Sequence, residues 1–83
     1  MTIKYFGAEW CNPCKALRPV VEKLAKEYGC KFEYIDVQEA IDECRENAVM
    51  GVPTVIFSNG SKEDRITGIK SEEGIREIIK SLM

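Results

Sequence analysis

Two of the four cysteines, Cys11 and Cys14, are separated by two residues, a spacing that suits disulfide exchange. We predict that a strand ends just before Cys11 and that a helix begins there. Backbone N–H groups at a helix start have no intrahelical partner and stabilise a thiolate, the nucleophilic form of cysteine. Cys14 lies one turn later on the same face, within reach of a disulfide. We therefore predict that Cys11 attacks a partner disulfide and that Cys14 resolves the mixed disulfide.

The same spacing occurs in metal sites, so a metal-binding or inert pair is the alternative interpretation. A structural zinc site usually has a second closely spaced pair, which Cys30 and Cys44 do not form. Covalent haem attachment requires a histidine where this sequence has Lys15. The sequence contains no histidine, which excludes His-based triads and His-ligated metals. We expect neither a metal nor a cofactor.

Cys30 and Cys44 have a different expected role. Cys44 lies on an apolar stripe of a predicted helix together with Ile41 and Ala48, and Cys30 follows a helix-ending glycine. Free cysteine usually packs as a small hydrophobe, so we predict that both pack, with a regulatory disulfide or a dimer link as alternatives. Four cysteines are few for a secreted disulfide scaffold, and no charged-then-apolar leader precedes the first strand. We expect a cytoplasmic location.

Apolar periodicity predicts seven elements in the order β-α-β-α-β-β-α. The predicted strands span residues 3–6, 31–36, 54–57 and the vicinity of 65–67, and the predicted helices span 11–28, 38–48 and the segment after Ser71. Ser71 is the predicted cap of the last helix, whose predicted apolar face comprises Ile75, Ile78, Ile79 and Leu82. The predicted apolar stripe of the first helix comprises Ala16, Leu17, Val20, Val21, Leu24 and Tyr28. Pro19 interrupts this helix, where we expect a kink rather than a break.

The order of these elements predicts the fold class. A β-α-β unit requires two parallel strands joined by a right-handed crossover, and Asn59-Gly60 predicts a hairpin between the last two strands. We therefore predict a single α/β domain over residues 1–83, in which three helices flank a four-stranded mixed sheet.

Composition excludes two classes of partner. The 83 residues carry 12 Lys and Arg against 14 Asp and Glu, and each half of the chain carries six positive and seven negative side chains. No basic stripe is therefore present to follow a phosphate backbone. No apolar run approaches the ~20 residues of a membrane helix. We expect a monomer that binds neither nucleic acid nor membrane.

The stretch Ala8-Glu9-Trp10-Cys11-Asn12-Pro13-Cys14-Lys15 resembles the active-site motif of thioredoxins, with Asn12 where glycine is usual. Three further features resemble that family at matching places: its helix-kinking proline (Pro19), its cis-proline loop (Val52-Pro53-Thr54) and a substrate-groove glycine (Gly68). The resemblance covers nearly the whole chain. It implies a minimal thioredoxin fold and a thiol–disulfide oxidoreductase that reduces protein disulfides.

The resemblance also implies roles for particular residues. Cys11 and Cys14 would be catalytic. The implied substrate-binding residues are Trp10, Val52, Pro53 and Gly68, and the implied supporting residues are Asn12, Pro13 and Lys15. The implied partners are disulfide-containing proteins and a reductase of the thioredoxin-reductase type.

The sequence departs from thioredoxins beneath the second cysteine. Thioredoxins have a buried aspartate there that helps to move a proton, and this chain has Tyr5. Their lysine on the neighbouring strand falls near Phe32. The usual proton acceptor for Cys14 is therefore missing, and water or Glu33 are the open alternatives. We expect a functional dithiol with a different pH dependence.

Two other functions remain as alternatives. The chain length and the aromatic residues Tyr5 and Phe6 resemble glutaredoxins, which bind glutathione. However, Ala8 falls near their lysine, and residues 68–71 keep only the first glycine of their Gly-Gly-x-Asp turn. The first alternative is therefore a glutathione-dependent reductase. The second is a non-catalytic binding module with the same fold.

Overall fold

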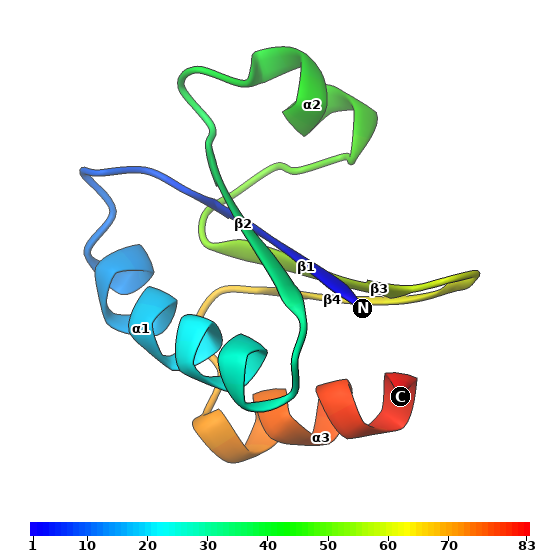
Figure 1. Cartoon of the computed structure of the whole chain (residues 1–83). Coiled ribbons are helices and arrows are strands. Elements are labelled where there is room, and N and C mark those ends of the chain that lie inside the picture. Colours follow the sequence, from blue (N-terminus) through cyan, green and yellow to red (C-terminus); the bar gives the residue numbers. More distant parts are fainter.

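The computed structural model describes residues 1–83 as one mixed sheet with three helices (Figure 1). In chain order the elements are β1 (Thr2–Gly7), α1 (Asn12–Glu27), β2 (Lys31–Asp36), α2 (Ile41–Glu46), β3 (Thr54–Asn59), β4 (Lys62–Thr67) and α3 (Glu72–Leu82). The strands lie in the order β2-β1-β3-β4. β1 is parallel to β2 and antiparallel to β3, which is antiparallel to β4. The predicted order and sheet type are confirmed.

The helices cover both faces of the sheet. Figure 1 shows α1 and α3 side by side beneath the sheet and α2 on the other face. Successive strand residues point to opposite faces of the sheet. Tyr5 therefore lies in the larger core, between the sheet and helices α1 and α3, and Phe6 lies in a smaller cluster with Ile35 and Ile56 on the other face. The larger core therefore lies directly behind the start of α1, where it positions the cysteine pair. None of the three helices is both long and apolar enough to cross a membrane.

Helix α1 continues through Pro19 without a break and is followed by Gly29 in the left-handed region, with φ of 68°. Its buried face consists of Cys14, Leu17, Val21, Leu24 and Ala25. Ala16 was predicted on the buried stripe and is exposed. An α-helix has 3.6 residues per turn, so Leu17 and Val21 lie on the same inner face. Ala16 lies outside that face.

Helix α2 is shorter than the predicted 38–48. The carboxylate of Asp36 accepts a hydrogen bond from the N–H of Gln38 at 2.8 Å, so the segment after β2 forms a turn instead of a helical start. At the other end Ala48 lies outside the helix, with φ of 54°. The predicted stripe of Ile41, Cys44 and Ala48 is therefore wrong for Ile41 and Ala48, which are exposed, whereas Cys44 is half-buried against the smaller cluster.

Strand β4 begins at Lys62, earlier than predicted. Asn59 pairs with Lys62, so the two-residue turn consists of Gly60 and Ser61. The first half of β4 is charged and exposed, as is common in an edge strand, and therefore has no apolar pattern to predict it. The last helix is confirmed: the Ser71 hydroxyl accepts from the Gly74 N–H at 3.1 Å, and Ile75, Ile79 and Leu82 are buried.

Candidate functional site

The cysteine pair lies at the junction of β1 and α1, as predicted. Cys11 is the N-cap of α1, with φ of −91° and ψ of 104°. Its Sγ accepts a hydrogen bond from the backbone N–H of Cys14 at 3.2 Å. The two sulfurs form a disulfide, with a Cα–Cα distance of 5.3 Å. The N–H that contacts this sulfur is one of the unpartnered donors of a helix start, which is the geometry that stabilises a thiolate after reduction.

Three neighbours shape this first turn. Asn12 and Pro13 occupy its first two helical positions, where the missing N–H of proline removes no intrahelical hydrogen bond. The first turn contains no acidic residue, so no carboxylate within that turn opposes a negative charge on Cys11. Asn12, Pro13 and Lys15 are exposed, whereas Cys11 and Cys14 are 5% and 3% exposed. The disulfide is therefore largely shielded from solvent, and Cys11 is slightly more exposed than Cys14.

The loop before β3, Val52-Pro53-Thr54, contains the cis-proline that the resemblance implied. The Val52–Pro53 bond is cis, and Pro53 is buried. The Pro53 carbonyl accepts from the N–H of Gly68 at 2.8 Å, and Gly68 has φ of 89°, a conformation that L side chains rarely adopt. Neither backbone group of Val52 takes part in a hydrogen bond within the chain. Val52 therefore presents an unpaired N–H and C=O.

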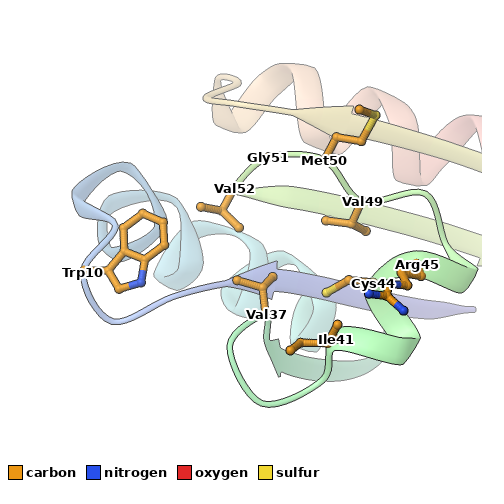
Figure 2. A pocket seen from close by; sticks show the side chains of 9 residues that line it. All are labelled: Trp10, Val37, Ile41, Cys44, Arg45, Val49, Met50, Gly51 and Val52. Carbon is orange, nitrogen blue, oxygen red and sulfur yellow. The ribbon is translucent and has the colours of Figure 1, made fainter.

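Trp10 and Val52 line the same apolar pocket, of about 370 Å³, which extends from the loop before Cys11 to α2 (Figure 2). The lining side chains come from the Trp10 loop, from β2's end, from α2 and from the segment before β3: Trp10, Val37, Ile41, Cys44, Arg45, Val49, Met50, Gly51 and Val52. Trp10, Ile41 and Met50 are three of the five large hydrophobic side chains that the structure leaves exposed. We define these nine residues as the Trp10 groove.

The groove contains residues that sequence analysis missed. Ile41 was assigned to packing, and its 56% exposure places it on the surface instead. Met50 received no role and is 97% exposed. The available signal was their apolar type, but their exposure depends on where α2 and the segment before β3 lie relative to the sheet.

A second cavity, of about 330 Å³, borders Cys14. Its lining comprises Ala8, Glu9, Cys14, Lys15, Arg18 and Tyr34. The guanidinium of Arg18 lies over the Tyr34 ring, 3.8 Å from its centroid, and Arg18 Nε contacts Glu22 at 2.6 Å. Burial, with smaller effects from the carboxylates of Asp36 and Glu9, raises the pKa of Tyr34. This cavity was not predicted.

Tyr5 occupies the position beneath Cys14 where the resemblance implied a missing acid. Its hydroxyl donates a hydrogen bond to the Cys14 carbonyl at 2.7 Å. Burial and the nearby Tyr34 raise the pKa of Tyr5 to about 12. Tyr34, rather than Phe32, lies opposite Tyr5 in the strand register. Glu33 alternates to the other face of β2 and pairs with Lys31, so it cannot act directly on Cys14.

Cys30 and Cys44 lie on opposite faces of the sheet. Cys30 packs against the larger core and Cys44 against the smaller one, so the two thiols cannot pair within one chain. Both are half-buried and unpaired. Burial raises the pKa of both thiols. No group of three or more Cys, Asp or Glu side chains is placed to hold a metal ion.

The raised pKa values predict slow modification of these two thiols. A raised pKa leaves less thiolate at neutral pH, so iodoacetamide should label Cys30 and Cys44 several-fold more slowly than Cys11 in the reduced protein. The difference should shrink as the pH rises. Time-resolved mass spectrometry of the labelled peptides measures this order, and equal rates at pH 7 would contradict it.

Comparisons with known proteins agree with the geometry. The family model "Thioredoxin" matches residues 1–81. The chain is 35% identical over 77 residues to a thioredoxin of Staphylococcus aureus, covering 89% of this chain and 74% of that protein. It is also 35% identical over 81 residues to the chloroplastic thioredoxin M4 of Arabidopsis thaliana, covering 94% of this chain but only 42% of that protein.

Solved structures give the same result. Thioredoxin 1 from the thermophilic eubacterium Thermosipho africanus superimposes with a TM-score of 0.89 and 32% identity, over 98% of this chain and 92% of that one. The family match, the shared fold and the disulfide at the start of α1 lead to one conclusion. The chain belongs to the thioredoxin family and is a thiol–disulfide oxidoreductase.

Proposed function

We propose that the protein reduces disulfides of protein substrates, with Cys11 as nucleophile and Cys14 as resolving thiol. The observation that carries these roles is the N–H of Cys14, which donates to Cys11 Sγ at the start of α1. A thiolate on Cys11 gains this hydrogen bond and the positive end of the helix. Cys14 is almost completely buried and has no equivalent donor, which suits a thiol that reacts second.

The proposed exchange conserves atoms and electrons. The Cys11 thiolate attacks one sulfur of the substrate disulfide, and the other substrate sulfur leaves as a thiolate and takes a proton from solvent. Cys14 then loses its proton to solvent, and its thiolate attacks Cys11 Sγ and breaks the bond to the substrate. The second substrate sulfur leaves as a thiolate and takes a proton from solvent. The substrate gains two electrons, and the protein ends as the Cys11–Cys14 disulfide that the structure contains.

The Trp10 groove and Val52 support binding of an extended substrate segment. The unpaired N–H and C=O of Val52 can pair with the backbone of such a segment, as in strand addition to a sheet edge. The groove can then hold an apolar side chain near the substrate cysteine. The hydrogen bond from the Gly68 N–H to the Pro53 carbonyl holds the loop that carries Val52.

Trp10→Ala should impair protein substrates selectively. We expect kcat/KM for insulin to fall by about five- to tenfold, because exposed tryptophans at recognition surfaces contribute strongly to binding. Reduction of a small aromatic disulfide should change by less than twofold. Ile69→Ala is the matched control, since Ile69 is equally exposed, at 63%, but lies outside the groove. Equal losses for both substrates would refute a role of the groove in protein recognition.

We further propose that a reductase of the thioredoxin-reductase type returns the pair to the dithiol. This proposal rests on the thioredoxin relatives, and it implies a compartment that keeps thiols reduced, such as the cytoplasm. We also propose that the protein acts as a monomer. The proposal needs no metal, nucleic acid or membrane. Glutathione is the competing electron donor, since the position before helix α3 keeps one glycine of the glutaredoxin turn.

One assay separates these electron donors. Insulin reduction is followed with NADPH and a bacterial thioredoxin reductase, and in parallel with glutathione and glutathione reductase. We expect turnover with the thioredoxin reductase and at least about tenfold less with glutathione. Turnover with glutathione alone would favour the glutaredoxin-like alternative, and no turnover with either donor would favour a non-catalytic binding module.

A further inference from the structure

The backbone of Cys14 is held at both of its polar groups. Its N–H donates to Cys11 Sγ at 3.2 Å, and its carbonyl accepts from the Tyr5 hydroxyl at 2.7 Å. Both contacts are buried. The residue that contacts the nucleophilic sulfur is therefore itself tied to β1, across nine positions in the sequence.

Packing fixes the hydroxyl that makes this contact. The Tyr5 side chain is fully buried, stacks on Tyr34 with ring centroids 5.9 Å apart and lies 6.1 Å from the Phe32 ring. The guanidinium of Arg18, from the first half of α1, lies over the Tyr34 ring, 3.8 Å from its centroid. The Tyr5 ring has little room to rotate or withdraw, so its hydroxyl remains aimed at the Cys14 carbonyl.

Tyr5 is a hydrogen-bond donor rather than an acid or base at neutral pH. Burial and Tyr34 raise the pKa of Tyr5 to about 12, so the phenol keeps its proton throughout the range in which thiols titrate. Its proton is also directed at a carbonyl and not at the sulfur of Cys14. Tyr5 therefore cannot replace the buried aspartate of thioredoxins as a proton carrier.

We propose that Tyr5 is a positioning residue of the dithiol: its hydroxyl holds the Cys14 carbonyl and thereby keeps the N–H of the same residue aimed at Cys11 Sγ. This inference rests on the proposed roles of Cys11 and Cys14. When the hydroxyl is absent, the first turn of α1 is free to shift relative to β1, and the hydrogen bond to the Cys11 thiolate weakens. The effect of Tyr5 on the nucleophile is thus transmitted through the backbone of residue 14.

Tyr5→Phe tests the proposal, because it keeps the ring and removes only the hydroxyl. The readout is the ultraviolet absorbance of the Cys11 thiolate against pH in the reduced protein, with Cys11→Ser in each background as the blank. We expect about a threefold smaller thiolate fraction at pH 7, as the titration moves to higher pH. Tyr34→Phe is the matched control: Tyr34 lies on the same aromatic stack but has no hydrogen bond to Cys14, so its titration should match the wild type.

A second substitution keeps the test decisive if Tyr5→Phe folds poorly. Site-specific 3-fluorotyrosine at position 5 preserves the hydroxyl and makes it a stronger donor, so the Cys11 titration should move in the opposite direction, to lower pH. Unchanged titration in the folded Tyr5→Phe variant, or in the fluorinated protein, would overturn the proposal. The titration needs no substrate, so failure here is distinct from failure of the proposed reductase activity, which the insulin assay reports.

Discussion

Replacing Cys11 by serine should lower the rate of protein-disulfide reduction by at least about three orders of magnitude. The hydroxyl of serine is not ionised at neutral pH, so the donor from Cys14 and the helix start have no thiolate to stabilise. Insulin reduction under excess reductase measures the loss. A wild-type rate in Cys11→Ser would mean that Cys11 performs no chemistry and that the fold serves as a binding module.

The Cys14→Ser variant distinguishes the two sulfurs. Cys11 should still attack the substrate, but the mixed disulfide then has no neighbouring thiol to resolve it and should accumulate as a covalent complex. Intact mass spectrometry detects this adduct. Cys30→Ser is the matched control, because this thiol is not paired with the dithiol and lies outside the Trp10 groove, and the variant should retain nearly the wild-type rate.

Phe57→Ala should have the largest effect on stability. Phe57 lies in β3, between β1 and β4, and is fully buried in the core beneath α1 and α3. Removing a buried phenylalanine ring costs about 3–5 kcal/mol, against a free energy of unfolding of about 4–12 kcal/mol for a domain of this size. The variant should therefore lose at least about a quarter of its free energy of unfolding.

Urea denaturation of the oxidised protein measures this loss. The control is Ser61→Ala in the exposed turn between β3 and β4, where we expect a change below about 0.5 kcal/mol. A loss below about 1 kcal/mol for Phe57→Ala would contradict the assignment of Phe57 to the centre of the core.

The helix starts at Cys11 and Ser71, which depend on local sequence, were predicted correctly, whereas the local turn at Asp36 that delays α2 was missed. The position of Cys11 at the start of α1 follows from a strand that ends at Gly7 and an apolar helical period that begins a few residues later. The cap at Ser71 and the buried face of α3 follow from the same kind of pattern. The cis bond before Pro53 was different, because only the resemblance to thioredoxins implied it.

Features that depend on tertiary register could not be predicted in this way. The bond from Tyr5 to the Cys14 carbonyl joins a strand to a helix, and it requires the inward face of β1 to meet the first turn of α1. The sequence therefore showed only that an acid was absent, not what the tyrosine does. Ile41 is similar: its apolar type suggested packing, but the short α2 leaves it in an exposed groove.

The central claim is that the start of α1 makes Cys11 the activated thiol of the pair. The most direct test is a pH titration of thiolate absorbance in the fully reduced protein, by stopped flow, with Cys11→Ser as the blank. The claim predicts that the pKa of Cys11 lies below about 8.5, the value of an unperturbed thiol. A pKa at or above that value would show that the helix start and the Cys14 N–H do not stabilise the thiolate, and would contradict the proposed mechanism.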